Sequence, residues 1–413
     1  MGGIRNPALK PEDERNPARH NRWQRDTWFM LLVLAVGVVT AFVLSAGGTA
    51  ITAAPGRAVG STPAATTTPA LRSGSPCTLA SATMSPGSAA GSLPAPGANG
   101  AAPVITSNYI IDQPNVGLMQ GSVDAQGNVW FGEMNVNKLV RLDSHTGSLL
   151  VCTPPKGSYG IMQTTVDGHG NVWYTEQNSG YIGKFVPATQ TFTTYPLDQV
   201  GGHSAGPQDL SFDPSGKLWF TEVSGNRIGR LDPATGSITS FTVPTPASSS
   251  TACPFSLAFT GSDVWYGDLC AGVVGRLDPA SGAITLIQPS TPHAQIFSMA
   301  ADHQGRVWFT ELEQGDLGMI DSHSGAVTEL RVPATFGPPS GLYAVTVAPN
   351  GDVWFAVASA NALVRYVPQS GVFSFFTLSI PASVPYGLTL DSAGNLWFTA
   401  DATPSNYVGM LHL

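Results

Sequence analysis

Acidic side chains recur at one position of a motif that the chain repeats. The motif is a Trp followed by an aromatic residue, a small residue and an acid, as in WFTE. Its acids are Glu133, Glu176, Glu222, Asp268 and Glu311. A carboxylate can act as a general base or bind Mg²⁺. Because an active site is one place and these acids stand in five equivalent places, we expect them to bind loop amides or Lys and Arg side chains such as Arg141, Lys184 and Arg230.

A second set of residues stands ten or eleven positions before each motif Trp and is mostly aromatic or Met. It consists of Met119, Met162, Gln208, Phe255, Phe297, Tyr343 and Tyr386. Gathered around one opening, such side chains would form an apolar, ligand-binding funnel. The alternative is ordinary packing of neighbouring strands. Which description holds depends on the fold that positions them.

Two histidines could supply acid–base or metal chemistry. His203 lies in VGGHSAGP and His293 in STPHAQIF, and both stretches lead into runs that carry the funnel residues. With Asp401, Glu313 or Asp316 they would form an acid–base or metal group. The alternative is that each is an exposed loop histidine.

The repeat itself predicts an all-β, seven-bladed propeller. Its Trp residues are Trp130, Trp173, Trp219, Trp265, Trp308, Trp354 and Trp397, spaced by 43 or 46 residues. Each unit has four short runs of alternating apolar residues, as a propeller blade requires. The funnel residues open the innermost run of each unit, so we expect them on the face where the inner strands begin, called the funnel face.

Ring closure is also expected from the repeat. The seventh unit ends inside its third run, whereas VITSNYIID at 104–112 precedes the first unit and is typical of an outer strand. We therefore predict a domain over 104–413 in which strand 104–112 completes blade seven. An open ring would leave an exposed strand edge, which proteins avoid.

Cysteines indicate an oxidising setting. Cys253 precedes the fourth inner strand and Cys270 follows the next strand, so antiparallel pairing brings them to one face and predicts a disulfide. Cys77 and Cys152 could pair as well, although the sequence does not require it.

The N-terminal quarter has a different composition. Residues 28–46 are 19 residues without a charge, preceded by four Arg residues at 15–25, which predicts a transmembrane signal anchor with a cytoplasmic tail over 1–27. Residues 47–103 are rich in Ala, Gly, Pro, Ser and Thr and are expected to be a disordered stalk. The protein would be a single-pass membrane protein with its propeller outside the cytoplasm, or a secreted one after signal cleavage.

Charge excludes one class of partner. Residues 104–413 carry 11 Lys or Arg and 23 Asp or Glu, a net charge of −12. Nucleic-acid binding needs the opposite charge. We expect a monomeric propeller whose funnel binds a small molecule, peptide or glycan.

Residues 104–413 resemble the virginiamycin B lyase (streptogramin B lyase) family. The resemblance is carried by WYTE followed by YIGKFVPATQTFTTYPL, and by WFTE followed by NRIGRLDPATGSITSFTVP. It implies a seven-bladed propeller that opens a cyclic depsipeptide antibiotic by elimination, with Mg²⁺ held by acids and a histidine as the base.

Residues of this chain differ from the family at the positions that carry the reaction. Tyr386 in SVPYGLTL stands where the family has its base histidine, and Val384 stands where it has a metal-binding Glu. Tyr343 replaces a second histidine, and Asp401 alone keeps the acidity of a second metal ligand. Histidine has a pKa near neutral pH and Tyr one near 10, so a Tyr is a poor base.

Two functions follow from the resemblance and from these departures. The first is a ligand- or partner-binding module that lacks the family's acid and base. The second is a carbon–oxygen lyase of the family type, or a related hydrolase, in which Tyr343, Tyr386 and Asp401 take part in catalysis and Asp401 binds Mg²⁺. No cofactor is required by the first.

Overall fold

The computed structural model describes residues 59–61, 66–67, 75–86, 104–111, 113, 116–155, 157, 160–247, 249–334, 339–401 and 406–413. These residues form β-strands joined by turns and loops. Among the described residues, no helix has the length and apolar character needed to cross a membrane. The cytoplasmic tail expected over 1–27 and the anchor expected over 28–46 lie outside the described residues.

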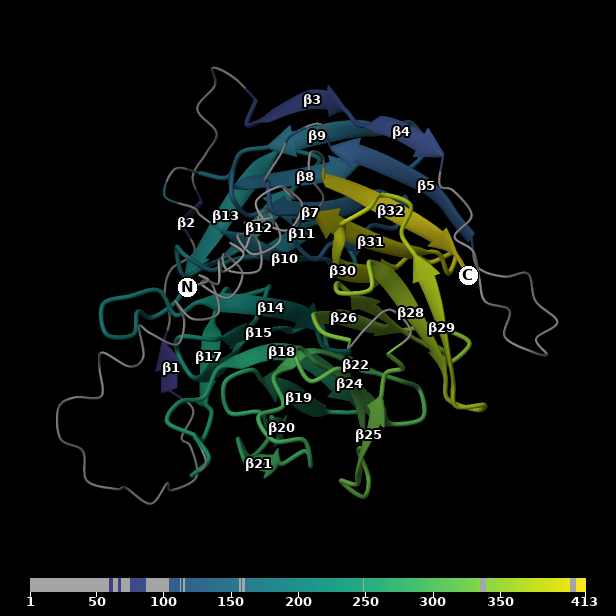
Figure 1. Ribbon diagram of the computed structural model, residues 1–413. Helices are drawn as coiled ribbons and strands as arrows, with labels where there is room; N and C mark the ends of the chain where they lie inside the picture. Colours follow the sequence, from purple (N-terminus) through teal and green to yellow (C-terminus); the bar gives the residue numbers. More distant parts are fainter. Residues whose placement is uncertain are drawn as a thin grey trace, which may run out of the picture. The chain divides into compact units, whose positions relative to one another are not determined.

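The strands form seven antiparallel sheets arranged as propeller blades, which confirms the predicted fold class (Figure 1). Blade 1 contains β6 (Ser122–Val123), β7 (Val129–Glu133), β8 (Lys138–Leu142) and β9 (Ser148–Cys152). Blade 2 contains β10 (Ile161–Val166), β11 (Val172–Glu176), β12 (Tyr181–Val186) and β13 (Thr191–Pro196). Blade 3 contains β14 (Pro207–Phe212), β15 (Leu218–Glu222), β16 (Arg227–Leu231) and β17 (Ile238–Thr242).

The remaining blades follow the same order from the centre outward. Blade 4 contains β18 (Pro254–Thr260), β19 (Asp263–Asp268), β20 (Val274–Leu277) and β21 (Ile284–Ile287). Blade 5 contains β22 (Ile296–Ala301), β23 (Arg306–Glu311), β24 (Asp316–Asp321) and β25 (Val327–Arg331). Blade 6 contains β26 (Leu342–Val347), β27 (Val353–Val357), β28 (Ala362–Val367) and β29 (Val372–Thr377). Blade 7 contains β30 (Val384–Leu390), β31 (Leu396–Asp401) and β32 (Asn406–His412).

Blade 7 takes its fourth strand from the start of the domain. The strand β5 (Val104–Ile111) pairs antiparallel with β32, with Tyr109 opposite Val408. Tyr109 and Ile111 are buried, and the Tyr109 ring stacks on Trp397 at 5.9 Å between ring centroids. The first and last strands of the propeller therefore share one sheet and close the ring.

Packing between blades depends on the motif Trp residues, all of which are buried. In five blades the Trp Nε1 donates a hydrogen bond to an Asp six residues earlier, as Trp219 does to Asp213 at 2.7 Å. The aromatic residue after the Trp lies against the Gly of the Ile-Gly-Arg run. A Cβ added to Gly229 would lie 2.2 Å from the Phe220 ring, so this position excludes a side chain. Both features are therefore structural.

Four short strands that precede the propeller in the sequence lie on its outer rim. The strands β1 (Val59–Ser61), β2 (Thr66–Thr67), β3 (Cys77–Ser81) and β4 (Thr83–Pro86) are called the N-terminal belt. They pair with β17, β13, β9 and β5, which are the outermost strands of blades 3, 2, 1 and 7. Figure 1 shows β3 and β4 along the rim beyond β9 and β5.

The belt corrects one expectation. Residues 47–103 are expected to be a disordered stalk because their composition buries little apolar surface, yet residues 59–61, 66–67, 77–81 and 83–86 within this range form strands. Backbone hydrogen bonds to exposed blade edges do not need such burial, and Cys77 and Cys152, which are cross-strand partners, form a disulfide. The predicted Cys253–Cys270 disulfide is also present.

Candidate functional site

A β-bulge marks the funnel position in most inner strands. The register shifts between Ile161 and Thr164 in β10, between Pro207 and Leu210 in β14, and at the equivalent places of β18, β22, β26 and β30. A bulge adds a residue to one strand and changes the direction of its side chains. The funnel residue and the residue after it therefore both leave the regular alternation of the strand.

Threonines of the Trp motif hold these bulges between blades. Thr175 Oγ1 donates to the Gln208 carbonyl at 3.0 Å, and Thr310 Oγ1 donates to the Tyr343 carbonyl at 2.8 Å. Thr221 makes the equivalent bond to Phe255 at 3.3 Å. Each threonine thus fixes the backbone of a funnel residue in the next blade, which is a structural reason for the Thr in WFTE.

Four of the predicted funnel residues form one aromatic cluster, defined as Phe255, Phe297, Tyr343 and Tyr386. The Phe297 ring lies 4.8 Å from Phe255, 5.1 Å from Tyr343 and 5.7 Å from Tyr386, between ring centroids. Tyr343 and Tyr386 are 5.3 Å apart. Phe297, Tyr343 and Tyr386 are buried and Phe255 is partly exposed. The rings of blades 4 to 7 therefore pack against each other around the start of the inner strands.

The other funnel positions are buried and less aromatic. Met119 and Met162 are apolar, whereas Gln208 accepts a hydrogen bond from Gln177 Nε2 at 2.6 Å. The Gln208 side chain also forms a hydrogen bond with Tyr386. Around the ring, the aromatic residues of blades 4 to 7 are thus followed by the apolar Met residues of blades 1 and 2 and by the Gln208 amide of blade 3.

Tyr386 is a neutral phenol at physiological pH. Burial raises the pKa of its hydroxyl well above the usual value, and the negative charges of Asp401 and Asp209 raise it further. The hydrogen bond with Gln208 opposes this shift only in part. A phenol of this kind can donate a hydrogen bond to a ligand, but it does not remove a proton from one.

Asp209, which the sequence did not indicate, is a second carboxyl group close enough to Tyr386, besides Asp401, to affect its pKa. It follows Gln208 in the bulge of β14, and its Oδ2 accepts a hydrogen bond from Leu257 N of the next blade at 2.7 Å. Burial raises the pKa of Asp209 to about 7, although hydrogen bonds from Leu257, Leu210 and Gln163 lower it. In blade 5 the equivalent residue, Ser298, accepts from Val345 N at 3.1 Å. Asp209 is therefore a bridge between blades that also titrates near neutral pH.

Asp401 occupies the junction of the last and first blades. Its Oδ1 accepts a hydrogen bond from Leu118 N at 3.2 Å, and its cross-strand partner is Val384. The Leu118 amide thus occupies one of the two carboxylate oxygens with which Asp401 could bind a metal ion. The neighbouring position that would supply a second carboxylate is the apolar Val384.

The two histidines lie in exposed connections that lead to the funnel face. His203 is held in its turn by backbone hydrogen bonds with Val200, and His293 has a left-handed backbone with φ of 55°. Within the described ranges, no three His, Cys, Asp or Glu side chains form a group that could hold a metal ion. The structure thus does not gather His203 or His293 with Asp401, Glu313 or Asp316 into such a group.

The acids of the Trp motif are buried and have different partners from blade to blade. Asp268 accepts hydrogen bonds from the amides of Cys253, Cys270 and Ala271, as expected for a scaffold acid. Glu222 forms an ion pair with Arg227 at 2.5 Å.

The cationic partners expected for these acids lie elsewhere. Arg141, Lys184 and Arg230 lie over the rings of Trp130, Trp173 and Trp219, with 5.0–5.9 Å between cation and ring centroid. Their strands place them on the side of the blade that carries the Trp, so the expected pairing with the acids is wrong for these three. Cation–π contact replaces it.

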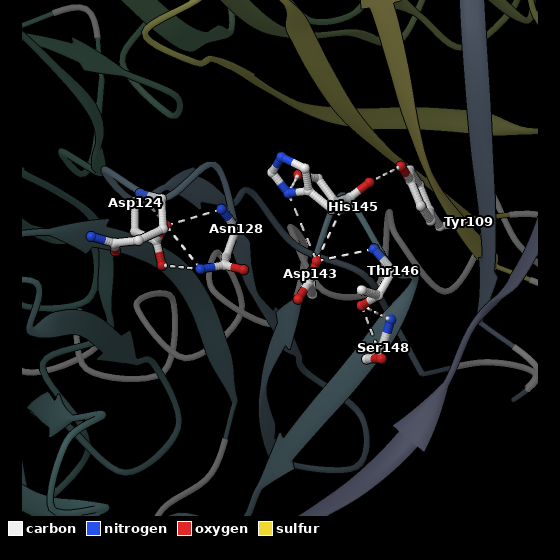
Figure 2. Close-up of polar contacts among 9 residues, drawn as sticks. Tyr109, Asp124, Asn128, Asp143, His145, Thr146 and Ser148 are labelled. Atoms are coloured by element: carbon white, nitrogen blue, oxygen red, sulfur yellow. Dashed lines mark hydrogen bonds and ion pairs between the residues drawn. The ribbon is translucent and has the colours of Figure 1, made fainter.

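Histidines on the opposite face belong to turns. Figure 2 shows His145 in the turn after β8, where Asp143 Oδ1 accepts hydrogen bonds from the amides of His145 and Thr146. Tyr109 Oη donates to the Ser144 carbonyl at 2.6 Å in the same turn. The His145 side chain is 77% exposed, so it serves the turn and not a buried site.

Comparison with known proteins gives one family. The model of the virginiamycin B lyase family matches residues 101–345. Selenomethionine-substituted virginiamycin B lyase from Staphylococcus aureus is 23% identical, with a TM-score of 0.65 over 74% of this chain and 98% of that one. A streptogramin B lyase structure is 25% identical, with a TM-score of 0.64 over 74% and 98%.

A third similar structure contains a ligand. It is a catalytically inactive His-to-Ala variant of the S. aureus lyase with quinupristin, 24% identical, with a TM-score of 0.64 over 74% of this chain and 99% of that one. No curated protein matches the chain at a significant level.

Proposed function

Because the chain belongs to the virginiamycin B lyase family, we propose that its funnel face binds an amphipathic small molecule or peptide without breaking it. The observation that carries the proposal is the aromatic cluster, in which Tyr386 stands where the resemblance implies the base histidine and Tyr343 where it implies a second, substrate-contacting histidine. Stacked and edge-on aromatic rings favour a ligand that presents an aromatic or apolar face. The nearby Gln208 amide suits a ligand with polar backbone groups.

Exposed apolar residues on the same face support binding at this end. Val136 in the β7–β8 connection and Val200 in the β13–β14 connection are 42% and 37% exposed. Both connections join strands on the side where the inner strands begin. Phe255 adds a partly exposed ring to this surface.

The family's Mg²⁺ does not fit the donor set of this chain. Two of the implied acid and base positions are Val384 and Tyr386, and Asp401 Oδ1 already accepts the Leu118 amide. Magnesium needs near-octahedral oxygen donors and is seldom held by one carboxylate alone. The proposed function therefore requires no metal ion.

A lyase or hydrolase activity is the second candidate, and Asp209 is the observation that favours it. A carboxylate with a pKa of about 7 is matched to proton transfer at neutral pH. However, Asp209 Oδ2 already accepts a hydrogen bond from Leu257 N, and Tyr386 is buried. Both observations indicate that a substrate would not reach the Asp209 carboxylate easily. Binding without turnover remains the preferred function.

A type B streptogramin tests the proposal directly. The purified protein is titrated with the antibiotic, and the mixture is analysed by mass spectrometry for linearised product. We expect binding that weakens at least tenfold in Phe255→Ala and no product. Phe373→Ala on the outer strand β29 is the matched control and should bind as wild type does. Product that disappears in Asp401→Ala or Asp209→Asn would overturn the proposal in favour of an enzyme.

We also propose that the propeller lies outside the cytoplasm and is tethered through residues 28–46. Two disulfides join all four cysteines, and disulfides persist in oxidising compartments. A phosphatase that is active only outside the cytoplasm, fused after Leu413, should be active. A cytoplasmic, inactive fusion would contradict the proposed location.

A further inference from the structure

The buried acid of blade 5 has a carboxyl group at the position where the acids of blades 1 and 3 have a cation. In blade 1, Glu133 is the cross-strand partner of Lys138, and in blade 3, Glu222 is the cross-strand partner of Arg227. Lys138 and Arg227 each stand five residues after the acid. Five residues after Glu311 the chain has Asp316, so a carboxyl group occupies the place of a cation.

Glu311 is enclosed without a compensating group. Its side chain is 0% exposed, and neither carboxylate oxygen has a well-formed hydrogen bond to any described residue. The side chains of Glu329 and Thr291 are near enough to affect its pKa. The local cation, Arg331, forms an ion pair with Asp316 at 3.1 Å. An ionised carboxylate that is buried without a partner is costly, so Glu311 should be neutralised either by a proton or by a cation.

Glu329 connects this cluster to the funnel face. Its carboxylate accepts hydrogen bonds from Ser290 N at 2.9 Å and Thr291 N at 2.8 Å, and also from the Ser290 hydroxyl. These residues belong to the 288–295 connection, which leads through His293 into β22. Phe297, the ring that contacts all three other members of the aromatic cluster, is the second residue of β22.

We propose that Glu311 and Glu329 bind one proton between them, and that loss of this proton loosens the 288–295 connection and makes the funnel face respond to pH. Glu311 is fully enclosed and Glu329 beside it is half-buried, and two adjacent carboxyl groups cannot both ionise cheaply when one of them is shielded from water, so Glu311 retains a proton. This response does not depend on the proposed ligand. It requires only that Glu329 hold the connection less firmly once Glu311 is charged.

The pKa directions agree with this geometry and identify the proton carrier. Burial raises the pKa of Glu311 to about 8, and the negative charges of Glu329 and Asp316 add to the shift. Hydrogen bonds from Ser290 and Thr291 lower the pKa of Glu329 to about 2. Of the other ionisable groups around the pair, Asp316 on β24 forms an ion pair with Arg331 on β25, and His293 is exposed in the connection. Glu311 therefore carries the proton at pH 7 and loses it above pH 8.

Amide hydrogen exchange tests the proposal. In the wild-type protein, exchange of the Ser290 and Thr291 amides, corrected for the intrinsic effect of pH, should accelerate at least tenfold between pH 7 and pH 9.5. Glu311→Gln, a neutral mimic of the protonated acid, should abolish the acceleration. Asp316→Arg, which restores the cation found in blade 3, should abolish it too. The Cys253, Cys270 and Ala271 amides, held by Asp268 in blade 4, are the internal control and should not accelerate.

Three results would overturn the proposal. The first is equal protection of Ser290 and Thr291 at pH 7 and pH 9.5 in wild type, and the second is the same acceleration in Glu311→Gln. The third is recovery of protection at pH 9.5 on adding CaCl₂ at constant ionic strength, which would show that the pair binds a divalent cation instead. Stability gives a separate readout. Since the folded pKa exceeds the unfolded value of 4.5, the wild-type unfolding constant should rise with pH between 4.5 and 8 by up to about tenfold per pH unit more than that of Glu311→Gln.

Discussion

At the scale of single residues, the threonine of the Trp motif contributes more directly to the candidate site than the acid beside it. Thr310 reaches from blade 5 to the carbonyl of Tyr343 in blade 6. The motif acids vary in their partners, whereas three threonines make the same bond to the next blade. The backbone of the aromatic cluster is thus positioned by buried hydroxyl groups that the sequence presents as part of a repeat.

Replacement of Thr310 by Val tests this role. The change keeps the shape of the side chain but leaves the buried Tyr343 carbonyl without its donor. We expect a loss of about 1–2 kcal/mol in the free energy of unfolding, together with a weaker near-ultraviolet circular dichroism signal from the aromatic cluster. Thr285→Val, at an exposed position of β21, is the control and should be nearly neutral. Equal losses in the two variants would contradict the role given to Thr310.

Asp209 predicts a specific dependence of stability on pH. Its folded pKa, about 7, lies above the unfolded value of 3.8, so its contribution is complete at low pH and is lost as the pH rises through 7. Asp209→Asn retains an oxygen for the Leu257 amide but cannot ionise. Since the side chain is partly exposed, we expect the variant to be only about 1–2 kcal/mol more stable than wild type at pH 8, with little difference at pH 4.

Denaturant unfolding at pH 4, 6 and 8 measures the difference between wild type and Asp209→Asn. A difference that stays constant across the three pH values would mean that Asp209 does not titrate in the folded protein near neutral pH.

At the scale of elements, repetition decided what the sequence could predict. The seven Trp motifs predicted the blades, because each strand repeats a pattern of burial. Asp209 was missed because regular alternation directs the residue after a funnel residue away from the channel, and a bulge breaks that alternation without a sequence signal of its own. The aromatic cluster was predicted as a set of positions, but the contacts between its rings depend on side-chain directions that the sequence does not show.

The N-terminal belt could not be predicted for a different reason. Strand β3, whose sequence is CTLAS, has no alternation of apolar and polar residues, and most of its side chains are exposed. Its pairing with β9 depends on backbone hydrogen bonds and on Cys77. Amino-acid composition indicates how much side-chain surface a segment can bury. It therefore does not predict a strand such as β3, which is stabilised by backbone hydrogen bonds and a disulfide.

The disulfide of the belt should stabilise the protein more than the one in blade 4. Cys77 and Cys152 are 75 residues apart in the sequence, and Cys253 and Cys270 are 17 apart. In the chain-entropy model a longer closed loop restricts the unfolded chain more, by about 1 kcal/mol for this pair of loop lengths. Replacing both cysteines by Ser should therefore cost about 4 kcal/mol for Cys77–Cys152 and about 3 kcal/mol for Cys253–Cys270.

Denaturant unfolding without reductant compares the two double variants. An unchanged midpoint after removal of Cys77 and Cys152 would show that the belt disulfide does not contribute to the stability of the propeller.

At the scale of the whole molecule, the ring is closed by contacts between residues far apart in the sequence. Tyr109 and Ile111 of β5 pack in the core with Trp397 and Val408, and Asp401 of blade 7 accepts the Leu118 amide of blade 1. Contacts of such long range form late and must form together, so the propeller should unfold as one cooperative unit.

Two shortened chains separate closure from the belt. A chain that begins at residue 104 keeps β5 but lacks the belt, and its melting temperature should fall only as far as loss of the Cys77–Cys152 disulfide lowers it. A chain that begins at residue 113 lacks β5, which exposes the edge of β32 and the apolar side chains that Tyr109 and Ile111 cover. Unpaired edges and apolar patches promote association, so this chain should aggregate or melt at a much lower temperature. Calorimetry with light scattering measures both properties. If the chain from residue 113 melted as wild type does, blade 7 would be stable with three strands and β5 would not be what closes the ring.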